Sequence, residues 1–255
     1  MLIETKKLRK NFGGLEAVAG VDFGIGAGEL RGLIGPNGSG KSTFLNVISG
    51  ILKADGGEVK YDNTDITNLK AHLIARKGIG RTFQAIRIFP EMTVLDNAKI
   101  SGAGAWKVNL GKVLLGYPSS RKNERVLEEK CREILDFVGL GQVENRVSGE
   151  LPFGLLRRVE IARALCLSPR VLLLDEPATG MNPMEKQNLM DVLKRINKEQ
   201  KIAIILVEHD MKFLMGIVES VTVFDHGEKI VEGFPKDVAS HPRVIESYLG
   251  AKKVF

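Results

Sequence analysis

Short apolar runs alternate with segments of helical periodicity along this chain. Residues 171–174 and 202–207 are continuously apolar, a pattern typical of strands that are buried on both faces. Between these two runs, apolar residues recur on one helical face: Leu189, Val192, Leu193 and Ile196. This alternation of strand and helix predicts a mostly parallel sheet that is covered by helices.

The first fifth of the chain contains a strand, a glycine-rich turn and a helix. Residues 29–34 predict the strand that leads into the turn, and residues 42–49 predict the helix that follows it. Gly50 comes directly after this helix, at a position where glycine commonly adopts the left-handed conformation that ends a helix.

The segment between about residues 84 and 166 has a different pattern. Apolar residues repeat there at helical spacing, without a strong strand signal: Leu127, Cys131, Ile134, Leu135 and Val138. Gly139 follows as a helix stop signal. Residues 101–120 are rich in glycine and serine at both ends, which predicts a flexible connection or a loop around a short helix.

These patterns predict a single domain over residues 1–255 with a smaller unit inserted into it. The α/β core comprises roughly residues 1–84 and 166–255. The inserted helical subdomain comprises roughly residues 85–165.

Composition narrows the class of protein. No apolar run approaches the roughly 20 residues that span a bilayer, and no apolar segment follows the basic N-terminus, so we expect a cytoplasmic protein. The net charge of +6 comes from scattered lysines and arginines, which argues against nucleic acid as a partner. Cys131 and Cys166 lack metal-ligand spacing, so we expect both to be reduced and buried.

Residues 35–42 read Gly-Pro-Asn-Gly-Ser-Gly-Lys-Ser and match the phosphate-loop pattern G-x-x-x-x-G-K-[ST] between a strand and a helix. Glycines let the backbone wrap a phosphate, and the loop amides and the helix N-terminus point at the anion. Lys41 supplies a cation for the β- and γ-phosphates, and the Ser42 hydroxyl is a ligand for Mg²⁺. The predicted nucleotide-binding residues of this segment are Gly35, Pro36, Asn37, Gly38, Ser39, Gly40, Lys41, Ser42 and Thr43.

Two carboxylates follow the apolar run at residues 171–174. Ligands of open α/β sheets bind at the carboxyl ends of the strands, so Asp175 can reach the Mg²⁺ ion. Glu176, one residue further on, is the candidate base that polarises the attacking water.

With these motifs in order, the chain resembles the ATP-binding subunits of ABC transporters over nearly its whole length. Phe12 stands where the family stacks an aromatic ring on adenine, with Val18 as apolar packing nearby. Gln84 resembles the Q-loop glutamine that touches Mg²⁺ or the attacking water, and His209 resembles the switch histidine that contacts the γ-phosphate. Residues 179–182 occupy the place of the D-loop, which crosses a dimer interface.

The resemblance implies the fold of a P-loop NTPase: an α/β core with a mostly parallel sheet flanked by helices, an antiparallel N-terminal β part and an inserted helical subdomain. It implies catalytic roles for Lys41, Gln84, Glu176 and His209. ATP and Mg²⁺ are the implied ligands, with Ser42, Gln84 and Asp175 on the metal.

Three runs, at residues 80–90, 157–164 and 241–250, are similar to branched-chain amino-acid importers, and importers of urea and short amides share much of them. The resemblance implies two ATPase subunits on transmembrane permease subunits at the inner face of the cell membrane. Two different subunits are usual in such systems, and both a heterodimer and a homodimer remain open. A separate solute-binding protein delivers the cargo. Residues 85–93, which include Phe89 and Pro90, are the candidate contact with a permease subunit.

Three alternatives remain open. The ATPase subunit of a lipid or lipopolysaccharide exporter would have a similar sequence, because the cargo never touches the ATPase. A soluble ABC ATPase of ribosomes or DNA repair usually carries two cassettes or a coiled-coil insert, and this chain has neither. A regulatory nucleotide binder without hydrolysis is disfavoured by the presence of Asp175, Glu176 and His209.

The signature segment departs from the family pattern L-S-G-G-Q. It comprises Leu151, Pro152, Phe153, Gly154 and Leu155. In the family this segment caps the γ-phosphate bound by the partner subunit, and Pro152 lacks both the hydroxyl and the N–H that a serine offers. We therefore expect two unequal ATP sites in the assembled pair. Asn182, where aspartate is commoner, is a milder departure.

Overall fold

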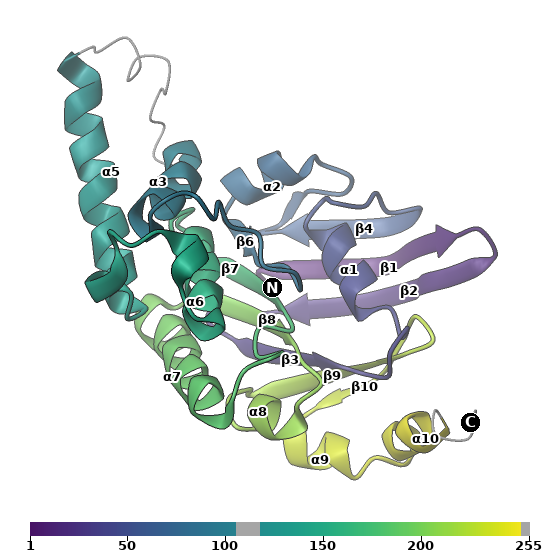
Figure 1. Ribbon diagram of the computed structural model, residues 1–255. Coiled ribbons are helices and arrows are strands. Elements are labelled where there is room, and N and C mark those ends of the chain that lie inside the picture. Colours follow the sequence, from purple (N-terminus) through teal and green to yellow (C-terminus); the bar gives the residue numbers. More distant parts are fainter. Residues whose placement is uncertain (106–117, 251–255) are drawn as a thin grey trace.

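A six-stranded, mostly parallel sheet forms the centre of the molecule (Figure 1). The computed structural model describes residues 1–105 and 118–250. The strand order is β10-β9-β3-β8-β7-β6, and only the edge strand β10 runs antiparallel to its neighbour. The strands are β3 (Leu30–Ile34), β6 (Ile79–Arg81), β7 (Val171–Asp175), β8 (Ala203–Val207), β9 (Ser220–Asp225) and β10 (Glu228–Gly233).

A second, antiparallel sheet is built by the N-terminal part of the chain in the order β2-β1-β4-β5. Its strands are β1 (Ile3–Phe12), β2 (Leu15–Ile25), β4 (Gly56–Tyr61) and β5 (Thr64–Asp65). This arrangement confirms the predicted α/β core with an antiparallel N-terminal β part.

Helix α1 (Lys41–Ile48) lies between the two sheets, and α2 (Ala71–Arg76) lies beside them (Figure 1). The apolar side of α1, with Phe44 and Leu45 fully buried, packs against both sheets in one hydrophobic cluster. Rings stack edge to face through this layer, with centroids 5.2 Å apart for Phe23–Phe44 and for Phe44–Phe224. This packing fixes the helix that follows the phosphate loop.

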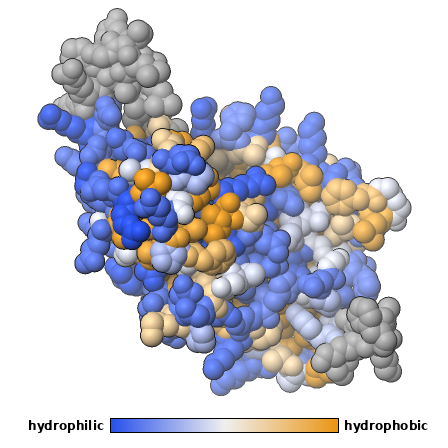
Figure 2. Space-filling model, in the orientation of Figure 1, coloured by the Kyte–Doolittle hydropathy of each residue, from blue (hydrophilic) through white to orange (hydrophobic). Residues whose placement is uncertain are grey.

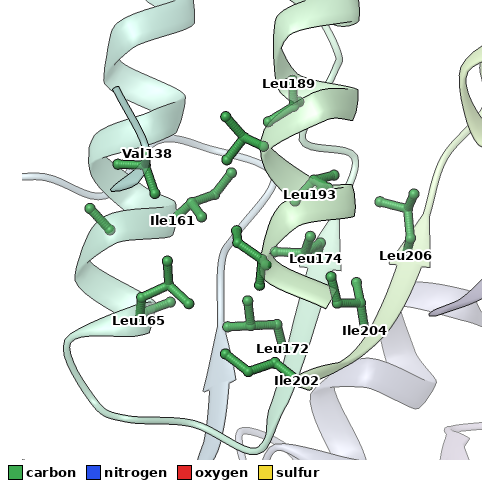
Figure 3. Close-up of a cluster of buried hydrophobic side chains, with 14 of the residues drawn as sticks. Val138, Ile161, Leu165, Leu172, Leu174, Leu189, Leu193, Ile202, Ile204 and Leu206 are labelled. Carbon is green, nitrogen blue, oxygen red and sulfur yellow. The ribbon is translucent and has the colours of Figure 1, made fainter. Parts of the chain in front are cut away.

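The opposite face of the parallel sheet is covered by helices of a second hydrophobic cluster (Figure 3). Helices α6 (Phe153–Leu165) and α7 (Pro183–Gln200) lie nearest the sheet, and α3 (Val94–Ala105) and α5 (Pro118–Phe137) extend the same cluster by packing against α6. In Figure 3, Leu189 and Leu193 of α7 point toward Leu172 and Leu174 of β7. Leu173, between these two, belongs to the other cluster, as the alternation of side chains in a strand requires.

The C-terminal part adds three short helices: α8 (Met211–Met215), α9 (Pro235–Ala239) and α10 (Pro242–Gly250). The 3₁₀ turns η1 (Gly141–Val143) and η2 (Ser148–Glu150) connect α5 to α6. No described helix combines the length and the apolar character that crossing a bilayer requires. Much of the face in Figure 2 is hydrophilic, with hydrophobic residues in patches between.

Most of the predicted elements are confirmed to within two residues. The helix at Lys41–Ile48 is followed by Gly50 with a φ of 72°, as expected for its position. Cys131 and Cys166 are buried without a disulfide, and their sulfur atoms lie 3.8 Å apart. No strand occurs among the described residues of the segment from 84 to 166, which agrees with its helical pattern.

The prediction for residues 101–120 needs a correction at both ends. Residues 101–105 continue α3, and residues 118–120 begin α5, so glycine and serine do not interrupt either helix. Residues 106–117 lie outside the described part of the chain. The proposed boundaries at residues 84 and 165 remain a prediction.

Candidate functional site

The phosphate loop connects β3 to α1 and requires glycine at several points. Gly40 has a φ of 100°, and a Cβ atom there would lie 2.1 Å from the carbonyl oxygen of Ala17. The first residue, Gly35, has a φ of 148°, and a Cβ atom would lie 2.0 Å from the carbonyl oxygen of Phe224. A side chain at either position would therefore displace neighbouring backbone.

Lys41 is buried in the loop, and its ammonium group already donates to the loop itself. Its Nζ atom lies 2.9 Å from the carbonyl oxygen of Gly35, 2.8 Å from that of Pro36 and 3.2 Å from Oγ of Ser39. Burial lowers the pKa of Lys41, and the nearby carboxylates of Glu176 and Asp175 act in the opposite direction. Lys41 therefore bridges three residues of the loop by hydrogen bonds, close to the carboxylates of Glu176 and Asp175.

Asp175 ends strand β7 and faces the start of α1. The Ser42 hydroxyl donates to its Oδ1 atom over 3.3 Å, so the two predicted metal ligands are adjacent. Arg81, at the end of β6, donates to Oδ2 over 3.4 Å and to Oγ of Ser49 over 2.6 Å. Burial raises the pKa of Asp175, and the guanidinium of Arg81 counteracts that rise.

Glu176 is the point where the predicted catalytic residues meet. Gln84 donates from Nε2 to Oε2 of Glu176 over 3.0 Å, and Nε2 of His209 lies 2.7 Å from Oε1. The Thr179 hydroxyl donates to Oε2 over 3.4 Å. Gln84, Glu176 and His209 come from three different strand ends, yet the fold brings their side chains into contact.

The meeting of these residues follows from the order of the strands. Strands β3, β8, β7 and β6 are consecutive neighbours, and they are mutually parallel. Their carboxyl ends therefore lie along one sheet edge, where ligands of open α/β sheets bind. The phosphate loop follows β3, His209 follows β8, the two acidic residues lie at the end of β7, and Gln84 follows β6.

Two residues of this site were missed in the sequence analysis. Arg81 lies 94 residues from Asp175, and only the pairing of β6 with β7 brings them together. Glu208 is buried and accepts a hydrogen bond from the backbone N–H of Ala178 over 2.7 Å. Burial raises the pKa of Glu208 to about 7. Its place between the β8 run and His209 was a visible signal, because the end of a parallel strand is a common site for functional side chains.

The predicted adenine platform lies at the end of β1. Phe12 is 47% exposed, and the ammonium of Lys10 lies 5.5 Å from the centre of its ring. Such exposure leaves a ring face that a base could stack on. Val18 is fully buried, so it supports this region from within the core.

The signature segment forms the N-terminus of helix α6. Pro152 is the N-cap residue and offers no side-chain hydrogen bond to the first turn. Phe153 is 42% exposed, and its ring faces Gly180, where a Cβ atom would lie 3.3 Å away. Among the described residues, no hydrogen bond joins the segment to the phosphate loop. Within the segment Phe153 is exposed, whereas Leu151 and Gly154 are buried.

The residues at the loop fit a magnesium ion. The described residues contain no group of three or more His, Cys, Asp or Glu side chains that could hold a metal. Ser42 and Asp175 nevertheless supply a hydroxyl and a carboxylate side by side. Mg²⁺ typically takes one or two carboxylates and completes its shell with water and substrate phosphates. A hollow of about 940 Å³ on the antiparallel sheet includes none of these residues.

Comparison with known proteins agrees with the family that the sequence motifs resemble. Residues 18–179 match the family model described as "ABC transporter". The chain is 38% identical over 249 residues to the high-affinity branched-chain amino acid transport ATP-binding protein BraF of Pseudomonas aeruginosa, covering 98% of each chain.

Solved structures agree with the sequence relatives. The ADP conformation of MJ1267, an ATP-binding cassette of an ABC transporter, superposes with a TM-score of 0.83 at 34% identity, covering 98% of each chain. The dimeric structure of the cassette MJ0796 bound to ADP and Pi has a TM-score of 0.72 at 26% identity, covering 91% of this chain and 98% of that one. This chain is an ATP-binding cassette and belongs to the ABC transporter family.

Proposed function

We propose that this ABC ATPase powers the import of branched-chain amino acids. The observation that carries its ATP-hydrolysing part is the cluster of Gln84, His209 and Thr179 around the Glu176 carboxylate, beside Asp175. A positioned carboxylate is what a water-activating base needs, and the phosphate loop is adjacent through the contact between Ser42 and Asp175.

Catalysis by these residues consists of positioning and charge stabilisation. Loop amides and Lys41 bind the phosphates, and Glu176 orients the attacking water and accepts its proton. Gln84 and His209 hold the Glu176 carboxylate from its two oxygens. Ser42, Asp175 and the amide oxygen of Gln84 would hold Mg²⁺, which, when bound, neutralises charge on the β- and γ-phosphates.

ATP is hydrolysed between two ATPase subunits that face each other head to tail. Each site combines the phosphate loop of one chain with the signature segment of the other. The exposed position of Phe153 supports this arrangement, and among the described residues the segment has no hydrogen bond to its own phosphate loop. The structurally similar cassette MJ0796 forms a dimer with ADP and Pi.

The segment after β6 carries the signal to a permease subunit at the inner face of the membrane. Helix α6 holds this segment firmly: Arg157 donates to the carbonyl oxygens of Phe83, over 2.8 Å, and of Gln84. Glu160 pairs with Arg157 over 2.7 Å and accepts the backbone N–H of Arg87 over 2.8 Å. Movement of residues 85–165 as a helical subdomain would therefore move Gln84.

The cargo assignment rests on the relative BraF, whose name gives branched-chain amino acid transport. A separate solute-binding protein and two permease subunits complete the transporter. Importers of urea or short amides, and lipid or lipopolysaccharide exporters, use similar ATPases. These alternatives are distinguished by assembling the chain with its permease and binding protein and measuring which solute raises the rate of ATP hydrolysis. Stimulation by leucine, isoleucine or valine is expected, and stimulation by none of these would overturn the cargo assignment.

The solution mass of the Glu176→Gln variant tests the nucleotide-driven pairing directly. With MgATP the variant should double in mass, alone or with a second ATPase subunit. The control variant Lys41→Ala should bind ATP weakly and remain a monomer. A Glu176→Gln protein that binds ATP and stays monomeric with every candidate partner would contradict the head-to-tail arrangement.

A further inference from the structure

Arg81 is a buried arginine beside the two predicted metal ligands Ser42 and Asp175, and the mechanism proposed above gives it no role. It ends strand β6, at the edge of the parallel sheet (Figure 1). The side chains of Arg81 and Asp175 are each 7% exposed, and they form an ion pair over 3.4 Å. Removing two charged groups from water costs free energy that their attraction repays only with further hydrogen bonds.

The register of the strands explains why Arg81 reaches this place. It pairs with Leu173 of β7, and residues 173 and 175 lie on the same face of that strand. Leu173 belongs to the hydrophobic cluster that includes Phe44 of α1. The side chains of Arg81 and Asp175 therefore meet in the layer between the sheet and α1.

Helix α1 contacts this ion pair with two serines that are seven residues apart and thus on one side of the helix. At its start, the Ser42 hydroxyl donates to Oδ1 of Asp175 over 3.3 Å. At its end, Oγ of Ser49 accepts from Nη1 of Arg81 over 2.6 Å, and Nη2 of the same guanidinium donates to Oδ2 of Asp175. The Ser49 hydroxyl itself donates to the carbonyl oxygen of Leu45 over 2.7 Å, which fixes the acceptor. Each oxygen of the Asp175 carboxylate thus has its own partner.

Stability alone is a poor explanation for an arginine at this position. Its Nε atom is buried and, within the described part of the chain, has no hydrogen-bond partner. A buried donor without a partner costs free energy, and an apolar side chain of similar volume would avoid that cost. A role in the chemistry of the neighbouring carboxylate gives a better reason.

We propose that Arg81 is a positioning residue for the metal ligand Asp175: it holds Oδ2, so that Oδ1 faces Ser42, where Mg²⁺ would bind. The inference rests on the proposed function, which assigns Mg²⁺ to Ser42 and Asp175. A guanidinium suits this task because its rigid fork reaches two acceptors at once, whereas the ammonium of a lysine is a compact point charge. Groups that orient a metal ligand from outside typically contribute about 10-fold to 100-fold in metal affinity.

The test compares Arg81→Lys with Arg170→Lys in the full chain. Both substitutions keep the positive charge, but Arg170 pairs with Asp62 at the surface, at the other end of β7. The probe is Mn²⁺ in place of Mg²⁺: the electron paramagnetic resonance signal of the free ion reports its affinity for the complex of protein and ADP. Arg81→Lys should bind Mn²⁺ about tenfold more weakly. Arg170→Lys should match the wild type.

The affinity for ADP without divalent metal separates positioning from damage to the fold. Because the phosphate loop is unchanged, Arg81→Lys should bind ADP in EDTA as the wild type does. Ser49→Ala keeps the ion pair and removes the acceptor of Nη1, so it should weaken Mn²⁺ binding by a smaller factor, and it replaces Arg81→Lys if that variant fails to fold. Unchanged Mn²⁺ affinity, or an equal loss of ADP affinity in EDTA, would overturn the inference. A wild type that fails to bind ADP would instead refute the proposed function.

Discussion

At the scale of single residues, the hydrogen bonds of the candidate site converge on the carboxylate of Glu176. Its two oxygens face different partners, His209 on Oε1 and the donors Gln84 and Thr179 on Oε2. Hydrogen bonds to an ionised carboxylate are stronger than those between neutral groups, so the side chain is held in one orientation. A water molecule bound in front of it would meet a base that is already aligned.

Glu176→Gln should separate binding from hydrolysis. We expect turnover to fall about a hundredfold or more, because an amide cannot accept the proton of water. ATP affinity should remain close to that of the wild type, since the phosphate loop is unchanged. Steady-state hydrolysis by the assembled complex and ATP binding by the isolated chain measure the two effects. Glu199→Gln, an exposed substitution in α7, is the control. Near-normal turnover would remove Glu176 from this role.

Glu208 predicts a pH dependence of stability. Its ordinary pKa of 4.5 rises to about 7 in the folded protein, chiefly because burial disfavours the charged form. Between these values the folded state binds more protons than the unfolded state, so this residue stabilises the fold below pH 4.5 and loses that effect as pH rises through 7. The full loss is at most about 3 kcal/mol.

Urea unfolding from pH 5 to 8 checks this prediction. The free energy of unfolding should fall more steeply with pH in the wild type than in Glu208→Gln, because glutamine does not ionise. The difference between the two proteins, rather than either absolute value, isolates Glu208 from the other titrating groups. Parallel curves would show that Glu208 titrates normally.

At the scale of elements, helix α7 is set in place by a capping box. The Asn182 side chain accepts from the backbone N–H of Glu185 over 3.0 Å, and the Glu185 side chain accepts from that of Asn182 over 2.9 Å. Pro183 occupies the first turn, where its missing N–H costs nothing. The cap places residues 179–182 directly before a helix that is packed on the core.

Asn182→Ala should destabilise the protein by about 1 kcal/mol, because the backbone N–H of Glu185 loses its side-chain acceptor. Asn182→Asp keeps the acceptor and should retain most of the wild-type stability. Urea unfolding midpoints at a common slope measure both changes. If alanine and aspartate had equal effects, the cap would not explain the sequence at this position.

The elements of the fold were more predictable than the contacts between them. Apolar runs and helical spacing predicted β7, β8 and α7, because burial on one face or on both leaves a periodic trace in the sequence. The partner of Asp175 left no such trace. Arg81 contacts it only because β6 pairs with β7, and strand order is a property of the assembled sheet.

At the scale of the whole molecule, the proposed pairing would combine this chain's phosphate loop with a partner's signature segment, and this chain's own signature segment is unusual. Pro152 stands as N-cap of α6 without a side-chain hydrogen bond, and Leu155 packs against the core. A serine at 152 would supply a hydroxyl to the helix terminus. A glutamine at 155 would change the packing as well, because it would remove buried apolar surface. Pro152 is therefore the cleaner position at which to test for unequal sites.

Pro152→Ser should raise ATP hydrolysis in the assembled complex, because the serine would add a hydrogen-bond donor to the γ-phosphate of the ATP that the partner subunit binds. Stability should rise by about 1 kcal/mol from the added cap, and the isolated chain reports that change separately. Measured at saturating ATP, an unchanged or lower rate would mean that the proline does not limit the partner site. The idea of unequal sites would then have to be abandoned.

The backbone at Glu176 has a consequence for how variation at this position is interpreted. Its φ is 50°, and its N–H donates to the carbonyl oxygen of Val207 over 2.9 Å. A side chain branched at Cβ is strained in this left-handed conformation, whatever its charge. A relative with valine or isoleucine here would therefore have lost both the base and the shape of the turn. Only unbranched replacements reveal, in natural or laboratory variants, what the carboxylate alone contributes.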